Sequence, residues 1–171
     1  MKKCAITSLA AAIVLTVLFL IMQWGIFETL AITFGTTAYH FWIRLLIGYV
    51  FDSKMKNHAD YHKRWYQVGI VEKAIYEKLK VKAWKNKMPT YDTDAFDIRQ
   101  HTWDEVAQAT CQSELVHETN VIFSFIPIAA SVCFGALPVF VITSVLAAAY
   151  DLMFVMMQRY NRARIIKILK G

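Results

Sequence analysis

The sequence predicts an all-α, polytopic membrane protein with about four transmembrane helices and a cytoplasmic, partly interfacial helical segment. Hydrophobic residues make up 57% of only 171 residues, and the mean hydropathy is +0.36. This is more apolar surface than one small soluble core can bury. The apolar residues also form long runs, and a helix needs about 20 such residues to cross a bilayer. We expect a single integral membrane domain over residues 1–171, with spans at 4–24, 30–51, 119–135 and 138–157 and a cytoplasmic segment at 52–118.

The first apolar run begins directly after Lys2 and Lys3 and contains no charged residue up to Met22. At a rise of about 1.5 Å per residue, a helix of this length crosses the hydrocarbon core. The alternative is a cleaved signal peptide, because the two lysines form a positive n-region. No small-x-small cleavage site follows Leu20 before Trp24, so we expect the run to remain as a span.

The second run, residues 30–51, is less apolar and could form a span or a re-entrant element. It contains His40 and Arg44, which lie one helical turn apart. A buried cation is costly in a bilayer, so such a pair faces a bundle interior or a water-filled cavity. Snorkelling of Arg44 to the interface is the alternative. Asp151, in the last apolar run, is either a partner for one of these cations or an interior polar contact.

The last apolar stretch, residues 121–157, is broken at Gly135 and Pro138, which indicates two helices joined by a tight turn. Basic residues precede the first run and follow the last one. Because cytoplasmic flanks carry the excess of Lys and Arg, both termini are expected in the cytoplasm. An even number of crossings follows, and the charge-rich segment 52–118 then also lies on the cytoplasmic side.

Within that segment, residues 69–87 have apolar side chains at helical spacing, surrounded by lysines. This pattern is typical of a helix that lies on an anionic leaflet, and Pro89 is expected to end it. The following loop contains Asp92, Asp94 and Asp97. It lacks the glycine and the terminal glutamate of a calcium loop, so we expect solvated carboxylates and no metal.

Thr102 followed by Glu105 fits a capping box and predicts the start of a helix that continues into the membrane. On that helix, Glu114 and His117 are three residues apart and share a face. A carboxylate can orient an imidazole and help it to act as a general base toward a hydroxyl. The alternative is a purely structural polar contact between helices.

The cationic cluster 158–164 begins where the last apolar run ends, at headgroup depth. Tyr160 and Asn161 interrupt its arginines and add directional hydrogen-bonding groups. The planar arginine fork suits phosphate, although such a cluster can also serve only to fix topology. Nucleic acid is not expected as a partner so close to lipid.

Three segments, 82–89, 114–117 and 158–164, resemble in order and spacing the glycosyl-4,4'-diaponeurosporenoate acyltransferase family of small bacterial membrane proteins. The resemblance extends over about residues 61–169. It implies a bacterial inner-membrane enzyme that transfers a fatty acyl group to a sugar hydroxyl of a membrane glycolipid, the last step of staphyloxanthin biosynthesis in the named member. Glu118 and Ala163 stand where the family pattern has Trp and Pro. The matching residues are Trp84, Lys85, Pro89, Glu114, His117, Arg159, Tyr160, Asn161, Arg162 and Arg164.

We therefore hypothesise an acyltransferase in which His117, oriented by Glu114, is the general base. The co-substrate is acyl-CoA or another acyl thioester, no cofactor is tightly bound, and the partners are membrane lipids with anionic headgroups. The alternatives are a non-catalytic module that binds lipid or recruits a partner, and a small transporter. The other expected roles are donor phosphate binding by Arg159, Arg162, Arg164 and Lys85, orientation of the oxyanion by Tyr160 and Asn161, and support from Trp84, His40, Arg44 and Asp151.

Overall fold

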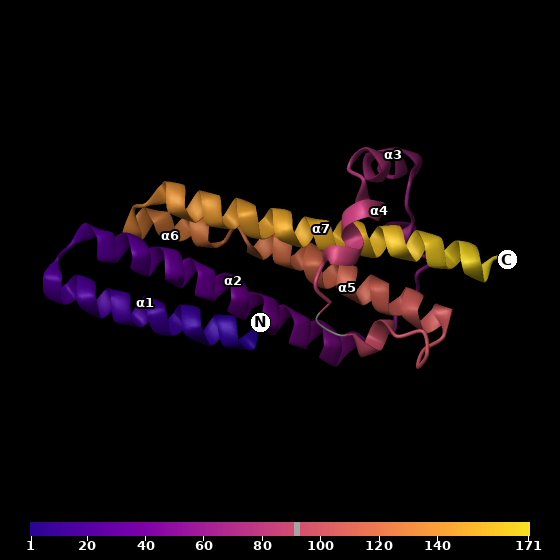
Figure 1. The fold of residues 1–171 in the computed structure, drawn as a ribbon, viewed down its shortest axis with the longest axis horizontal. Helices are drawn as coiled ribbons and strands as arrows, with labels where there is room; N and C mark the ends of the chain where they lie inside the picture. The colour runs from indigo at the N-terminus through magenta and orange to yellow at the C-terminus, as the bar shows by residue number, and fades with distance from the viewer. Residues whose placement is uncertain (91–92) are drawn as a thin grey trace. The chain divides into compact units, whose positions relative to one another are not determined.

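The protein is built from helices, as the computed structural model shows for residues 1–90 and 93–171 (Figure 1). Four helical stretches are long and apolar enough to cross a membrane, and no strand occurs among these residues. The predicted all-α fold class with four candidate spans is therefore confirmed. The long helices are α1 (Lys2–Met22), α2 (Gly25–Met55), α5 (Trp103–Phe123) with its continuation α6 (Pro127–Phe134), and α7 (Leu137–Leu169).

The turn between α1 and α2 is short because one residue reverses the chain. Gln23 adopts a left-handed conformation (φ 58°, ψ 24°), and its N–H donates to the carbonyl of Phe19 at 2.8 Å. This contact satisfies a carbonyl that the end of the helix leaves free. Trp24 then stacks on Phe27 in the first turn of α2, with the ring centroids 5.9 Å apart.

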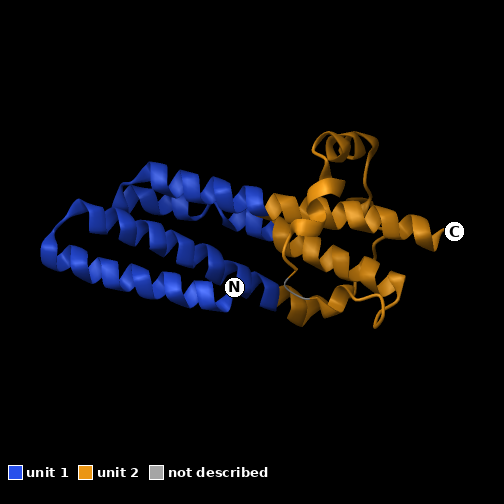
Figure 2. Cartoon of the chain, in the orientation of Figure 1, with its two compact units in different colours: residues 1–49, 119–150 blue, residues 50–118, 151–171 orange. Residues whose placement is uncertain are grey.

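The chain divides into two compact units (Figure 2). Unit 1 contains residues 1–49 and 119–150, and unit 2 contains residues 50–118 and 151–171. The helices α2, α5 and α7 each contribute to both units. The charge-rich central part of the chain belongs to unit 2, together with the residues of the C-terminal arginine cluster.

In unit 1, hydrogen bonds to backbone carbonyls tie α2 to α5 and α7. The hydroxyl of Tyr39 donates to the carbonyl of Phe123 at 3.0 Å, and Nη2 of Arg44 donates to the carbonyl of Ala147 at 3.0 Å. Nη1 of Arg44 donates to the carbonyl of His40 at 2.6 Å. The guanidinium is therefore directed into the helix bundle of this unit, which favours the interior placement of Arg44 over snorkelling.

Unit 2 has a small hydrophobic core between α5, α7 and the segment that precedes α3. Small side chains of α5, such as Ala107, allow the aromatic side chains of that segment to pack closely. The predicted capping box is confirmed, because the Glu105 carboxylate accepts hydrogen bonds from the N–H and the hydroxyl of Thr102 at 2.8 and 3.0 Å. The buried core residues are Tyr61, Tyr66, Val106, Ala107, Cys111 and Ile165.

The helix expected over residues 69–87 is wrong as one continuous element. It is divided into α3 (Ile70–Lys78), α4 (Val81–Trp84) and the 3₁₀ turn η2 (Lys85–Lys87). The break lies at Lys80, whose left-handed conformation (φ 52°, ψ 41°) cannot continue a right-handed helix. The indole Nε1 of Trp84 donates to the carbonyl of Leu79 at 3.0 Å and so stabilises the break.

Two further 3₁₀ turns, η1 (Arg64–Tyr66) and η3 (Asp94–Phe96), lie in the connections before α3 and before α5. In the aspartate-rich loop, the Asp97 carboxylate accepts a hydrogen bond from Nη2 of Arg99 at 2.7 Å. Asp92 lies outside the described residues. Within residues 1–90 and 93–171, no group of three or more His, Cys, Asp or Glu side chains is arranged to hold a metal ion.

Candidate functional site

A buried carboxylate on α5 joins two arginines of α7. Oε1 of Glu114 accepts a hydrogen bond from Nη1 of Arg159 at 2.5 Å, and Oε2 accepts one from Nη2 of Arg162. The side chains of Glu114 and Arg162 are both fully buried. A buried carboxylate is tolerated only when it is paired and hydrogen-bonded, and the two guanidiniums meet both conditions. The 114–117 and 158–164 segments are therefore in contact in unit 2.

Arg162 also binds Tyr66 in η1. Nε and Nη2 donate to the Tyr66 carbonyl at 3.2 and 2.9 Å, and the guanidinium carbon lies 5.0 Å from the centroid of the Tyr66 ring. The Nη1 atom of Arg162 is buried and has no hydrogen-bond partner among the described residues. Arg162 therefore holds η1 against α7 and α5 and is not open to solvent.

Arg159 binds a second carboxylate, that of Glu72 on α3. Its Nε and Nη2 donate to the two carboxylate oxygens, the latter at 3.1 Å, and Nη1 and Nη2 also donate to the carbonyls of Trp65 and Gln67. Burial raises the pKa of Glu72, but the hydrogen bonds and charge of Arg159, with a hydrogen bond from Tyr76, outweigh it, so the pKa is lowered. Glu72, Glu114, Arg159 and Arg162, called the arginine–glutamate cluster below, balance their charges.

This arrangement changes the interpretation of two arginines that were expected from the sequence to bind phosphate. The hydrogen bonds that Arg159 and Arg162 donate go to carboxylates and carbonyls of unit 2. A phosphate of the acyl donor would have to compete with these hydrogen bonds at either guanidinium. The planar guanidiniums join α3, η1 and α5 to α7. The spacing of arginines in residues 158–164 does not distinguish this structural use from phosphate binding.

His117 is paired with a carboxylate, but not with the expected one. Its Nδ1 atom lies 2.8 Å from Oδ1 of Asp151 on α7, and its ring stacks on Phe154 with the centroids 4.4 Å apart and an interplanar angle of 6°. The partner expected from the spacing, Glu114, is occupied by the two arginines. The side chain of Asp151 is 1% exposed and that of His117 is 19% exposed, so the imidazole is the accessible member of the pair.

A second cationic site involves η2 and the last turns of α7. Nζ of Lys85 donates to Oδ1 of Asn161 at 2.8 Å and lies 5.7 Å from the centroid of the Tyr160 ring. Burial lowers the pKa of Lys85, and the nearby charge of Arg164 lowers it further. Neither Lys85 nor Arg164 forms an ion pair with a carboxylate of the described residues. Two neighbouring cations that have no carboxylate partner within residues 1–90 and 93–171 form a candidate anion site.

The imidazole and the candidate anion site lie along one face of α7. His117 stacks on Phe154, and Lys85 binds Asn161, seven residues further along the helix. Seven residues correspond to two turns, so both α7 side chains share a face and are separated by about 10 Å along the axis. All four residues belong to unit 2. A ligand that follows this face could contact both sites.

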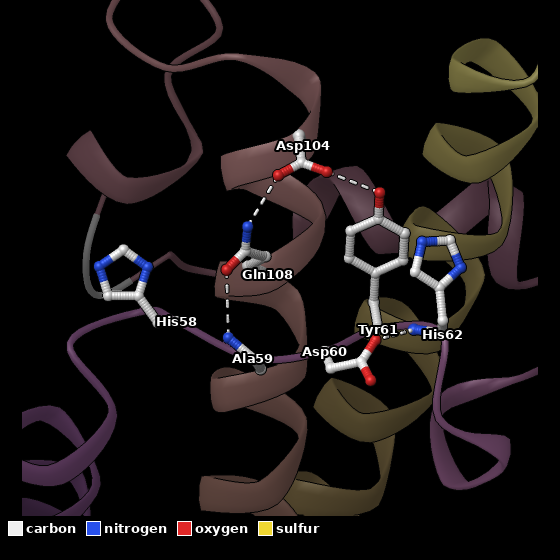
Figure 3. Close-up of a pocket in the computed structure, with 7 residues that line it drawn as sticks. All are labelled: His58, Ala59, Asp60, Tyr61, His62, Asp104 and Gln108. Atoms are coloured by element: carbon white, nitrogen blue, oxygen red, sulfur yellow. Dashed lines mark hydrogen bonds between the residues drawn. The ribbon is translucent and has the colours of Figure 1, made fainter.

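A shallow cavity of about 510 Å³ in unit 2 has a polar wall that the sequence did not indicate (Figure 3). The Asp104 carboxylate accepts hydrogen bonds from the Tyr61 hydroxyl at 2.6 Å and from Nε2 of Gln108 at 2.7 Å, and Oε1 of Gln108 accepts one from the N–H of Ala59 at 3.2 Å. These groups satisfy one another. The rings of His58 and His62 and the carboxylate of Asp60 complete the lining, which contains none of the predicted site residues.

One member of the arginine–glutamate cluster, Glu72, was not predicted, and neither was the Tyr66 carbonyl that accepts hydrogen bonds from Arg162. Glu72 lies among the lysines of a surface helix, and the Tyr66 carbonyl is a backbone group, so neither had a signal in the sequence. Asp151 did have one, because an aspartate in an apolar run requires a partner. The supporting residues are placed differently: Trp84 stabilises the break before α4, whereas His40 and Arg44 belong to unit 1.

No curated protein and no solved structure matches the chain significantly. The sequence profile of one protein family does match, over residues 58–171. This range is two-thirds of the chain and includes all four members of the arginine–glutamate cluster, the His117–Asp151 pair and the candidate anion site. The chain therefore belongs to the glycosyl-4,4'-diaponeurosporenoate acyltransferase family.

Proposed function

We propose that the protein transfers a fatty acyl group from an activated thioester donor, such as acyl-CoA, to a hydroxyl of a membrane glycolipid. The reaction is proposed to occur at the cytoplasmic face of the cell membrane, where the basic C-terminal segment is expected. The family name supports an acyltransferase of carotenoid glycolipid biosynthesis. The four apolar helices support a membrane-bound enzyme.

One observation carries the chemical proposal: the short contact between His117 and Asp151. A buried aspartate that accepts the Nδ1–H of a histidine fixes the tautomer, which leaves Nε2 as the base, and it stabilises the imidazolium after proton transfer. Stacking on Phe154 holds the ring plane. Asp151 takes the orienting role that the spacing assigned to Glu114, and Glu114 becomes a structural residue.

In the proposed step, Nε2 of His117 removes the proton from the acceptor hydroxyl as the oxygen attacks the thioester carbonyl. A new C–O bond forms and the carbonyl electrons move onto the oxygen. When the C–S bond breaks, the thiolate leaves and takes the proton from the imidazolium. The products are an ester and a free thiol, and the base is regenerated without a covalent acyl-enzyme.

The anionic part of the donor is proposed to bind at Lys85 and Arg164. These cations lack a carboxylate partner within the described residues, unlike Arg159 and Arg162. The arm that links the phosphates of coenzyme A to its thioester would follow the shared face of α7 from Asn161 toward Phe154. The amide of Asn161 and the hydroxyl of Tyr160 remain candidates to orient the donor or its oxyanion.

The test is acyl transfer by the purified, reconstituted protein with labelled acyl-CoA and extracted membrane glycolipids. His117→Ala is expected to lower turnover by about 10²–10⁴-fold, the usual contribution of a general base. Asp151→Asn is expected to lower turnover strongly while donor affinity is retained, since it changes the tautomer and leaves the binding site intact. His101→Ala, a change at a side chain that is 39% exposed and lies outside the candidate site, is the matched control.

Melting temperatures of the three variants are compared with that of the unchanged protein, so that unfolding is not mistaken for lost chemistry. Full turnover by folded His117→Ala would refute the base assignment. If the unchanged protein binds lipid but converts no thioester donor, the chain is better described by the alternative, a lipid-binding or partner-recruiting membrane module.

A further inference from the structure

The helix α3 turns its polar side toward the rest of unit 2. The Glu72 carboxylate binds Arg159, and the Tyr76 hydroxyl donates to Glu72. Tyr76 is buried, with its ring edge packed against Tyr160 at a centroid distance of 6.4 Å. Glu72 and Tyr76 are one turn apart, so they define the inner face of the helix.

The opposite side of α3 is apolar and exposed. Ile70 is 87% exposed, Val71 75% and Ile75 47%, and the exposed Ala74 lies between them on the helix surface. A surface helix of a soluble protein has the reverse orientation, with its apolar stripe on the core and its charges in water. An isoleucine or valine left in water forfeits the free energy of burial, so contact of this face with an apolar environment is favourable.

The charges around this face indicate which environment covers it. Lys73, Lys78, Lys80 and Lys82 are exposed and form no ion pair with the described residues. A basic amphipathic helix places its apolar side chains at the boundary of headgroups and acyl chains and extends its lysines to lipid phosphates. The protein has four candidate membrane spans, so the bilayer itself is an apolar environment that α3 can reach.

We propose that the outer face of α3 binds the anionic surface of the membrane, as an interfacial helix with Ile70, Val71 and Ile75 inserted. The proposal rests on the exposed apolar face of α3, the lysines around it and the candidate membrane spans, and not on the acyl transfer proposed above. It has a consequence for the cluster. Glu72 on the inner face holds Arg159, and Arg159 holds Glu114, so a bilayer contact at α3 also holds the arginine–glutamate cluster in place.

The test measures the depth of α3 in full-length protein reconstituted in vesicles. Ile75→Cys carries a bimane label, with the exposed Cys4 and Cys133 replaced by Ala and the buried Cys111 retained. Spin-labelled lipids with the nitroxide high on the acyl chain are expected to quench this label. Gln100→Cys, in an exposed loop, is the matched control and is expected to show little quenching.

The lipid composition tests the role of the lysines. Quenching at position 75 is expected to be at least twofold stronger in vesicles of phosphatidylcholine with phosphatidylglycerol than in pure phosphatidylcholine. Lys73→Gln with Lys78→Gln should remove this difference. If Ile75→Cys fails to fold, Val71→Cys tests the same face. Equal, weak quenching at 75 and 100 in both lipids would overturn the proposal. Efficient disulfide cross-linking of the unlabelled Ile75→Cys variant to a second copy of the chain would also overturn it.

Discussion

Glu114 on α5 and Arg162 on α7, 48 residues apart in the sequence, form an ion pair in which both side chains are fully buried. Arg159, on the same helix as Arg162, contacts the other oxygen of Glu114 and connects it to Glu72 on α3. Three helices of unit 2, α3, α5 and α7, are thus joined by one network of ion pairs. A buried charge without its partner is costly, so the cluster makes the docking of these segments interdependent.

The first prediction concerns Glu114→Gln. Removing one member of a buried ion pair leaves uncompensated charge, and we expect a loss of about 3–5 kcal/mol in the free energy of unfolding. The measurement is thermal unfolding in mild detergent. Glu77→Gln, an exposed change on α3, is the control and is expected to change stability little.

This prediction also separates two roles for Glu114. If Glu114 is structural, the activity of Glu114→Gln should fall only as the folded fraction falls. A variant with unchanged melting temperature and abolished turnover would instead support the role that the i,i+3 spacing suggested, as a carboxylate that acts with His117.

The parts of the fold that sequence could predict are those set by local chemistry. The apolar runs predicted four helices because a bilayer imposes length and composition on each span separately. The capping box at Thr102 needs only two residues within one turn, and its hydrogen bonds are present. The break at Lys80 was missed because a lysine in a left-handed conformation has no local signature.

The candidate site was predicted as a set of residues but not as a set of pairs. Spacing placed Glu114 beside His117 on one helix, yet which carboxylate reaches the imidazole depends on how α7 packs against α5. That packing brings Asp151 to His117 and leaves Glu114 to Arg159 and Arg162. Partner choice between distant segments is a property of tertiary structure, which periodicity along a single helix does not contain.

The second prediction is a pH limit on donor binding. Burial and the charge of Arg164 lower the pKa of Lys85, so Lys85 loses its proton at a lower pH than an ordinary lysine. As the pH rises, binding of acyl-CoA should therefore begin to weaken at a lower pH than the usual lysine pKa would suggest. The measurement is the dissociation constant of acyl-CoA as a function of pH.

Two variants control this experiment. Lys85→Arg keeps its charge at all accessible pH values, so the alkaline loss should disappear. Arg164→Gln removes the neighbouring charge, which should move the loss to higher pH while weakening binding overall. A pH profile that is identical in all three proteins would contradict a donor site at Lys85.

The third prediction concerns acid stability through Glu72. Arg159 and Tyr76 hold the pKa of Glu72 below its ordinary value of 4.5. A depressed carboxyl pKa contributes stability above the unfolded-state pKa and loses it as the pH falls through the folded-state value. Glu72→Gln should thus be less stable than the unchanged protein at neutral pH. The difference in stability between the two proteins should shrink below about pH 4.5. The measurement is thermal unfolding at a series of pH values. A stability difference that is the same at every pH would contradict the prediction.

The fourth prediction concerns the start of α5. Thr102→Ala removes the hydroxyl that accepts the N–H of Glu105 at 3.3 Å and donates to the Glu105 carboxylate at 3.0 Å. Loss of such a cap costs about 0.5–2 kcal/mol. Hydrogen exchange in the first turn of α5 should become faster, with little change near Glu114. Thr90→Ala, in the preceding loop, is the control, and equal protection of this turn in both variants would show that the cap contributes no stability.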